Sequence, residues 1–324
     1  MRMKCNKVFV RTCFSVKINA CILLHVIIAL GYVNTMAQTV PSNNKVVVFG
    51  TSLDPVNQIQ ESKKLAASLV SQQSKQWRSK GDQLRKYHFP GIDSVLPYRL
   101  YVPTRWDGKS KLPLVMFLHG AWNDESSYLD ADDKLMLRLA EQHGYILVAP
   151  LGYSKLGGYG TCLHLPVLFG KDDEALKMIA EQTTERWHTL ELSEKDVINV
   201  LEQVLAEYPI DRKNVFLTGH SMGAGGTWYL GAKYADYWKA LAPMSGPFVL
   251  QTLYPWDRIR KKPVLITEGT KTGQALSSSR QLADWMTEEK FNIEYKEVDA
   301  DHGGMVPLVL PQVFEFFNRC RSKR

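Results

Sequence analysis

Cysteine is scarce in this chain, and its placement excludes two classes of fold. Only five cysteines occur among 324 residues, and Cys5, Cys13 and Cys21 lie near the N-terminus. Cys162 and Cys320 are too few and too far apart in sequence for a disulfide framework, and neither has a partner at the spacing of a structural zinc site. Whether these two cysteines pair in an oxidising compartment stays open. We expect no bound metal.

A long hydrophobic run is lacking as well. The apolar run Cys21–Val33 is shorter than the roughly 20 residues that a membrane-spanning helix needs. It follows a basic start and precedes Thr35-Met36-Ala37, where small or tolerated residues suit a signal peptidase. We therefore predict that residues 1–37 are a cleaved signal peptide and that the mature protein is secreted or periplasmic, outside the membrane. The alternative is an uncleaved N-terminal anchor.

Without that segment, little charge imbalance remains. The whole chain carries 40 basic and 33 acidic residues, a formal net charge of +7. Residues 1–37 hold five of the basic residues and none of the acidic ones, which leaves 35 against 33 and a net charge of +2. The basic character is thus mostly a targeting feature, and it gives no reason to expect a nucleic-acid partner.

Repeats and low-complexity tracts are also missing, and the chain instead alternates between two kinds of segment. Short apolar runs are predicted to be strands at Pro97–Val102, Leu114–Leu118, Tyr145–Ala149, Asn214–Thr218, Lys239–Met244, Val264–Thr267 and Ile293–Val298. Helical spacing is found at Asp132–His143, Glu194–Glu207, Ala224–Ala235 and Ser277–Lys290. This alternation predicts an α/β fold with a mostly parallel central sheet flanked by helices, over residues 95–324.

Two stretches do not follow the alternation. Residues 38–94 are polar, and we predict an N-terminal helical extension there with one long helix, Pro55–Tyr87. Residues 152–192 are long for a connection and begin glycine-rich, so we predict a lid-like insertion. Parallel sheets place their ligands at the carboxyl ends of the strands, which is where the chemistry is expected.

The most specific motif is Gly219-His220-Ser221-Met222-Gly223. It follows the apolar run 215–217 directly and precedes a small-residue helix start at 224–226. A strand-to-helix turn this tight needs glycines on both sides of the serine, and it lifts the hydroxyl above the sheet. Ser221 is therefore predicted to be a nucleophile. The alternative is a serine in a glycine-rich turn with no reaction.

A serine hydroxyl needs a base, and the attack needs donors for the oxyanion. His302 lies directly after the last predicted strand, which is the position of the base in this architecture. The amide of Met222 in the elbow and the amide of Ala121, which follows His119-Gly120 at another strand end, are the candidate donors. Nearby Trp122, Tyr153 and Tyr159 are candidate pocket walls, although for any one of them core packing is favoured.

These segments together resemble a known family. The runs PYRLYVP, PLVMFLHGAW, ILVAPLGY, NVFLTGHSMGAGGTWYLGAKYADYWKALAPMSG and DADHGGMV look like the α/β-hydrolase esterases related to polyhydroxybutyrate depolymerases and feruloyl esterases, with kinship to the prolyl oligopeptidase-type catalytic domain. The resemblance covers about residues 96–318. It implies a small-molecule or polymer ester as substrate, no cofactor, Ser221 as nucleophile, His302 as base, and Ala121 and Met222 as oxyanion donors.

One position departs from that family. Its pattern after the penultimate strand is His-Gly-Thr-x-Asp, whereas this chain has Glu268-Gly269-Thr270-Lys271-Thr272, with Thr272 where the acid should be. Three explanations are open: Glu268 serves as the acid, another acid reaches in, or the protein is a weakened or noncatalytic pseudohydrolase that binds a ligand.

A serine peptidase of the prolyl oligopeptidase type is a further alternative. Residues 38–94 leave no room for the propeller domain that those peptidases carry, which favours an esterase. The sequence identifies neither the acyl group, nor the alcohol, nor the oligomeric state.

Overall fold

The computed structural model describes residues 50–72, 76–165 and 167–322. The predicted signal peptide, 1–37, lies outside the described residues. The strands are β1 (Gly81–Phe89), β2 (Ser94–Val102), β3 (Leu112–Leu118), β4 (Ile146–Pro150), β5 (Ile210–His220), β6 (Ala240–Met244), β7 (Val264–Gly269) and β8 (Ile293–Val298). The helices are α2 (Pro55–Gln72), α3 (Ser127–His143), α4 (Asp172–Ala180), α5 (Thr184–Glu207), α6 (Met222–Lys233), α7 (Gln274–Glu288) and α8 (Met305–Cys320), with short 3-10 turns at Gly158–Gly160 and Trp256–Arg258.

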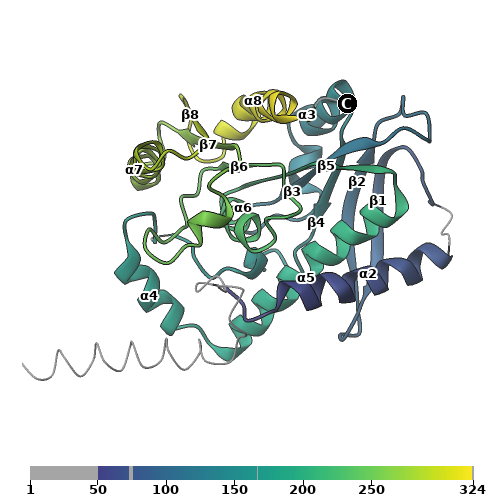
Figure 1. Cartoon of the computed structure of the whole chain (residues 1–324), viewed down its shortest axis with the longest axis horizontal. Coiled ribbons are helices and arrows are strands. Elements are labelled where there is room, and N and C mark those ends of the chain that lie inside the picture. Colours follow the sequence, from purple (N-terminus) through teal and green to yellow (C-terminus); the bar gives the residue numbers. More distant parts are fainter. Residues whose placement is uncertain (1–49, 73–75, 166, 323–324) are drawn as a thin grey trace, which may run out of the picture. The chain divides into compact units, whose positions relative to one another are not determined.

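The strands form one eight-stranded sheet in the order β1-β2-β4-β3-β5-β6-β7-β8 (Figure 1). Strand β2 is antiparallel to both β1 and β4, and the pairs from β4 through β8 are parallel. The predicted α/β fold with a mostly parallel sheet is confirmed. Because β3, β5, β6, β7 and β8 run the same way, the loops that follow them gather at one edge of the sheet.

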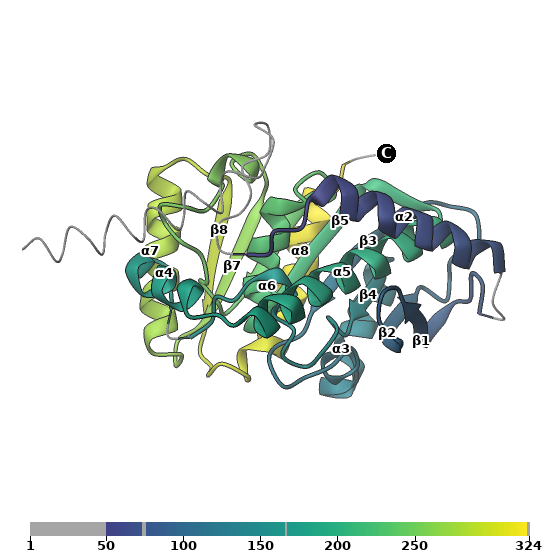
Figure 2. The same ribbon diagram turned by 90° about the horizontal axis from the view of Figure 1, so that it is seen from below.

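Alternate residues of the central strands face two separate apolar layers. On β3, Met116 packs with α5 and α6, whereas its neighbours Val115 and Phe117 pack with α3 and α8. Helices therefore cover both faces, which is why these strands are apolar throughout. Figure 1 shows α3 and α8 together above the sheet, and Figure 2 shows α2 running along α5 on the outside of the other layer.

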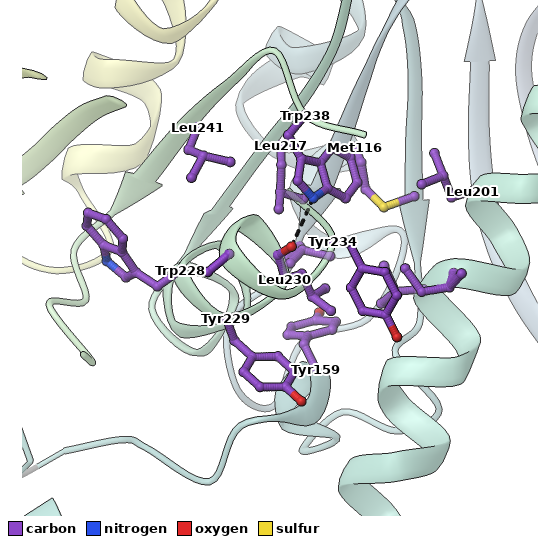
Figure 3. Close-up of a cluster of buried hydrophobic side chains, with 14 of the residues drawn as sticks. Met116, Tyr159, Leu201, Leu217, Trp228, Tyr229, Leu230, Tyr234, Trp238 and Leu241 are labelled. Atoms are coloured by element: carbon purple, nitrogen blue, oxygen red, sulfur yellow. Dashed lines mark hydrogen bonds between the residues drawn. The ribbon is translucent and has the colours of Figure 1, made fainter. Parts of the chain in front are cut away.

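Helix α6 lies at the centre of the larger apolar layer (Figure 3). Trp228, Tyr229 and Leu230 on this helix are fully buried. The indole nitrogen of Trp238 donates a 3.0 Å hydrogen bond to the carbonyl oxygen of Leu230. A helix held on all sides in this way is a rigid support for the residue that precedes it, Ser221.

The predicted helix Pro55–Tyr87 is wrong in its second half. Helix α2 ends at Gln72, and Gly81–Phe89 is instead β1, paired along its length with β2. Exposed and buried residues alternate strictly from position 82 to 89, so Leu84, expected in a buried helical stripe, is 65% exposed while Tyr87 and Phe89 are buried. Period two, not helical spacing, is the pattern of this segment. The extension therefore contributes an edge strand to the main sheet.

The stretch predicted as a lid, 152–192, has two parts. Its glycine-rich start is packed into the core: Tyr159 is fully buried against α6, and any side chain at Gly160 or Gly226 would collide with Tyr229 or Tyr159. Its later part forms α4 and the beginning of α5. Coverage of the site by this second part stays a prediction.

A buried ion pair ties the start of the described chain to α6. Lys233 Nζ lies 2.8 Å from a carboxylate oxygen of Glu194 on α5, and both side chains are almost fully buried. Thr51 donates its hydroxyl to Glu194 at 2.5 Å and accepts a hydrogen bond from Lys233 at 3.1 Å. Tyr229 and Tyr234 also donate to Glu194. Removing one member of such a cluster leaves an uncompensated buried charge, at a cost of about 3–5 kcal/mol.

Both cysteines outside the predicted signal peptide are free thiols. Cys162 belongs to the apolar layer of α5 and α6, and Cys320 packs against the layer of α3 and α8 on the other face of the sheet. The sheet separates them, so they do not pair in this fold. Within the described residues, no helix is both long enough and apolar enough to cross a bilayer.

Candidate active site

Ser221 stands between β5 and α6 with a strained backbone. Its φ of 58° and ψ of −119° are unusual for a residue with a side chain. The glycines around it are required by space, since a Cβ on Gly223 would lie 2.0 Å from the carbonyl oxygen of Leu118 and one on Gly219 would lie 2.4 Å from the carbonyl oxygen of Gly223. The elbow geometry anticipated from the motif is therefore present.

The loop after β3 runs beside this serine. A Cβ built on Gly120 would lie 3.4 Å from the Cβ of Ser221, which places Ala121 next to the elbow. Met222 is the first residue of α6, so its amide has no partner within the helix. The Ala121 amide donates to no backbone carbonyl among the described residues. Both predicted oxyanion donors thus flank Ser221.

Two hydrogen bonds and an ion pair brace the loop that carries Ala121. The Trp122 amide donates to the carbonyl oxygen of Lys155 at 2.9 Å, and the ring of His119 lies 2.8 Å from the carbonyl oxygen of Leu151. Lys155 Nζ also lies 3.0 Å from a carboxylate oxygen of Asp124. The loop after β4 in turn donates hydrogen bonds to Asp196 of α5.

Asp196 is fully buried and accepts three hydrogen bonds. The amides of Gly152 and Tyr153 donate to its carboxyl group at 2.7 and 3.0 Å, and the hydroxyl of Tyr87 donates at 2.6 Å. Burial raises the pKa of Asp196 to about 6, although these hydrogen bonds oppose the shift. The brace beneath the oxyanion loop therefore contains a titratable group.

His302 is brought to the elbow through its neighbour His220. The two rings are 4.5 Å apart between centroids, and His220 is the residue before Ser221. His220 Nε2 donates to the backbone carbonyl oxygen of His302 at 2.8 Å, and its Nδ1 accepts from the hydroxyl of Tyr128 at 2.7 Å. Burial and the charge of His302 lower the pKa of His220 to about 3, so it is a neutral strut rather than a base.

The partner of His302 on its own ring is a hydroxyl. Its Nδ1 lies 2.8 Å from the Oγ of Ser245, the residue that follows β6. Burial lowers the pKa of His302, and the negative charges of Glu268 and Asp301 oppose that shift. No carboxylate oxygen is hydrogen-bonded to this ring in the part of the chain that the structure describes.

Glu268 and Thr272, the positions at issue in the sequence, lie after β7. The Glu268 side chain is fully buried, and its two oxygens accept from the amide of Gly269 at 3.1 Å and from the hydroxyl of Ser279 at 2.8 Å. Thr272 donates its hydroxyl to the carbonyl oxygen of Gly269 at 2.8 Å. Glu268 thus acts on His302 through its charge and not through a direct hydrogen bond.

Backbone strain is present at this edge of the sheet, as it also is at Asp132–Lys134 in α3. Trp122, Tyr153, Ser221 and Ser245 all have positive φ, and they lie in the connections after β3, β4, β5 and β6. Strain of about 1–3 kcal/mol per residue persists only where the surroundings enforce it, and it is common at functional sites. These strained residues therefore lie at the edge of the sheet that carries the candidate catalytic residues.

Of the three aromatic residues named as candidate pocket walls, Tyr159 has the favoured alternative, core packing. Tyr159 is fully buried and donates to the carbonyl oxygen of His119, so it supports the site from within the core. Tyr153 is half-buried and packs near Phe89. Trp122 is 76% exposed beside the Ala121 amide, an unusual position for a large apolar side chain.

Two cavities lie away from this edge of the sheet. One of about 430 Å³ is lined by residues 238–239 and 257–263, and another of about 390 Å³ by Lys111 and residues 205–213. These residues precede β6, β7 and β3, and precede or begin β5, so both cavities are at the amino ends of the strands. In the first cavity, Arg258 and Arg260 donate to backbone carbonyl oxygens at the ends of α6 and α7, which explains the basic lining.

Sequence reasoning missed Ser245, the strut role of His220 and the brace formed by Asp196. Serine after a buried strand carries no distinctive signal by itself. Its location at the carboxyl end of a strand next to the elbow strand was the only clue. Asp196 lies within α5, whose ordinary amphipathic spacing gives no signal of a supporting role for this residue.

Residues 90–304 match the family model for esterases, described as "Putative esterase". The chain belongs to this esterase family. Among curated proteins, it is 28% identical over 150 residues to the bifunctional acetylxylan esterase/xylanase XynS20E of Neocallimastix patriciarum, a match that covers 46% of this chain and 18% of that protein. The chain therefore spans less than a fifth of that relative's length.

Solved structures share the fold. A thermostable esterase has a TM-score of 0.56 at 21% identity, with 74% of this chain and 62% of that chain covered. The ferulic acid esterase AmCE1/Fae1A of Anaeromyces mucronatus, solved with ferulic acid, has 0.52 at 19%, covering 76% and 93%. The serine hydrolase FphF of Staphylococcus aureus has 0.52 at 17%, covering 75% and 99%. These neighbours establish the α/β-hydrolase fold.

Proposed function

We propose that this protein hydrolyses a carboxylic ester through an acyl-enzyme on Ser221. The observation that carries the proposal is the strained Ser221 elbow, flanked by two amides and adjacent through His220 to the ring of His302. Membership of an esterase family supports the choice of bond. No cofactor or metal has a part in these steps.

In this mechanism His302 takes the proton of the Ser221 hydroxyl as the oxygen attacks the ester carbonyl. The amides of Ala121 and Met222 hold the oxyanion, and each such donor is worth roughly 3–4 kcal/mol in the transition state. The protonated His302 then gives its proton to the departing alcohol. Water repeats the sequence on the acyl-enzyme and releases the acid. Glu268 supplies negative charge that favours the imidazolium.

The nucleophile is tested with a fluorophosphonate probe on folded protein. We expect one adduct, located on Ser221 by peptide mass spectrometry, and none in Ser221→Ala. Ser277→Ala is a matched control, because Ser277 is an exposed serine of α7. Absence of an adduct on Ser221 in the wild type would refute the proposed mechanism.

The bond is tested with a panel of substrates. We expect hydrolysis of p-nitrophenyl acetate and longer acyl esters, and none of peptide anilides. The reverse selectivity would indicate a peptidase. Binding of esters without turnover by wild type would instead indicate a pseudohydrolase, which the hydroxyl partner of His302 makes the most pertinent alternative.

We also propose that the chain is exported with removal of residues 1–37. The basic start and the short apolar run support this. Expression of the full chain in a bacterial host, followed by N-terminal sequencing of the periplasmic or secreted form, should give a start close to residue 38. A full-length protein retained in the membrane fraction would contradict it.

A further inference from the structure

The third position of the site is filled by a serine hydroxyl. Ser245 follows β6, is 1% exposed, and has a positive φ of 47°. Its amide donates to the carbonyl oxygen of Thr267 on β7 at 2.9 Å, which fixes its backbone between the two strands. Its Oγ lies 2.8 Å from His302 Nδ1. Because strained residues cluster at functional sites, this buried contact between Ser245 and the ring of the base indicates a functional role.

We propose that Ser245 is the positioning residue of His302, and that its neutral hydroxyl orients the ring as the carboxylate does in an acid-containing triad. This inference rests on the proposed serine mechanism. For the base to accept the proton of Ser221 on Nε2, the proton of the neutral ring must be on Nδ1. Ser245 Oγ is the acceptor that stabilises that tautomer and that ring orientation.

Two other groups could have filled the role, and their contacts exclude them. Glu268 uses its oxygens on the Gly269 amide and on Ser279, and its carboxylate is fully buried there. Thr272 turns its hydroxyl to the carbonyl oxygen of Gly269. Ser245 alone, among the described residues, has an oxygen at hydrogen-bonding distance from His302 Nδ1.

A hydroxyl fixes the tautomer of His302 less strictly than a carboxylate would. It can also donate to Nδ1, which would put the ring proton on Nε2 and leave the base unable to act. It offers no charge to the imidazolium, so only Glu268 on β7 and Asp301 on the histidine's own loop raise the pKa of His302 against its burial. The adjacent His220 is neutral and adds no charge at neutral pH. The arrangement therefore gives His302 a correctly oriented but weakly basic ring.

The test uses Ser245→Ala, Ser245→Asn and Ser245→Asp in the full mature chain. With Ser245→Ala we expect kcat on p-nitrophenyl acetate to fall about tenfold while KM stays within about twofold, as for loss of one net hydrogen bond. With Ser245→Asp we expect the acid limb of kcat/KM to move up by about one pH unit, because a carboxylate favours the charged ring. Ser245→Asn, equal in size and neutral, should leave the limb in place.

Asparagine and aspartate tolerate positive φ, so this pair keeps the test valid if the alanine variant unfolds. Ser278→Ala is the matched control, because Ser278 is another buried serine, hydrogen-bonded to the carbonyl oxygen of Phe169 and remote from His302 in its contacts. It should not change kcat. Unchanged kcat and pH limb in Ser245→Ala, or identical limbs for the aspartate and asparagine variants, would overturn the proposal.

The titration of His302, followed by NMR of labelled histidine, separates this inference from the proposed function. Ser245→Asp should raise the pKa of His302 even in Ser221→Ala, where no turnover occurs. If wild type neither reacts with the fluorophosphonate nor cleaves esters, the proposed function fails while the NMR shift still decides the role of Ser245.

Discussion

His220 Nε2 donates to the backbone carbonyl oxygen of His302 across 2.8 Å, so the residue before the predicted nucleophile holds the main chain of the predicted base. A carbonyl oxygen only accepts, so the ring proton of His220 is on Nε2. Its Nδ1 therefore accepts a hydrogen bond from the hydroxyl of Tyr128. The strut fixes the distance between two loops that follow different strands.

Removal of the hydrogen bond from His220 should leave the main chain of His302 less firmly held. We expect His220→Ala to lower kcat by about tenfold or more and to lower the free energy of unfolding by about 1–3 kcal/mol, since it leaves buried polar groups unpaired. Ester kinetics and chemical denaturation check this. Tyr128→Phe is the control: it removes the outer hydrogen bond but keeps the one to His302, so it should affect stability more than kcat. Equal loss of kcat in both variants would argue against the strut.

Thr272→Asp places a carboxylate at the last position of the His-Gly-Thr-x-Asp pattern, where this chain has Thr272. A triad acid is worth up to about 10⁴-fold in a protease. Here the Thr272 hydroxyl donates to the carbonyl oxygen of Gly269, and a carboxylate, which has no proton to donate, must turn away from that oxygen. We expect a more modest gain of about tenfold in kcat/KM. Thr272→Asn, which adds no charge, should give no gain. An unchanged rate in the aspartate variant would mean that the present arrangement already supplies what the base requires.

Glu268→Gln tests the distant charge. The Glu268 carboxylate raises the pKa of His302, so its neutralisation should lower that pKa further and move the acid limb of kcat/KM to lower pH, with a reduced kcat at the plateau. Glutamine can keep contacts to Ser279 and the Gly269 amide. Asp301→Asn also removes a carboxylate near His302, but an exposed one, so water should screen its effect to a smaller shift. A limb that moves upward in Glu268→Gln would contradict this assignment.

Asp196 predicts how stability depends on pH. Its pKa in the folded protein is about 6, above the ordinary value of 3.8, so the folded state binds the proton more tightly than the unfolded state. The resulting stabilisation is complete below pH 4 and is lost as pH rises through 6, an effect of about 3 kcal/mol. We expect Asp196→Asn to remove this downward slope in denaturation curves measured from pH 4 to 7. The slopes are compared, not the absolute values, because asparagine also alters the hydrogen bonds. Equal slopes in both proteins would refute the prediction.

Much of the fold followed from the sequence because the central strands are buried on both faces. Continuous apolar, β-branched runs such as Val264–Thr267 have few other fates, and all seven predicted strands are present. Strand β1 was missed because Asp82 and Lys86 at its exposed positions also suit a helix surface, and Leu84 fitted a helical apolar stripe although it is exposed. Helix α8 was missed because proline disfavours a helix interior, yet α8 is continuous through Pro307 and Pro311, and Val309, Leu310 and Phe314 bury its apolar face.

The site was predictable only where backbone geometry constrains residue type. Glycines around Ser221 are required by the close approach of the Leu118 carbonyl, so the motif could be recognised. The contact between Ser245 and His302 spans 57 positions and depends on the strand order of the sheet. A pattern of residue types along the chain does not contain that information.

The buried cluster of Thr51, Glu194 and Lys233 also sets an order of events during synthesis. Thr51 leaves the ribosome early, but Glu194 follows 143 residues later and Lys233 182 residues later. The initial segment therefore cannot dock until α6, and with it the Ser221 elbow, has been made. Domains form as units around such late contacts. For the export that we propose, this delay leaves Thr51 without its partners Glu194 and Lys233 while the chain is threaded unfolded through a translocation channel.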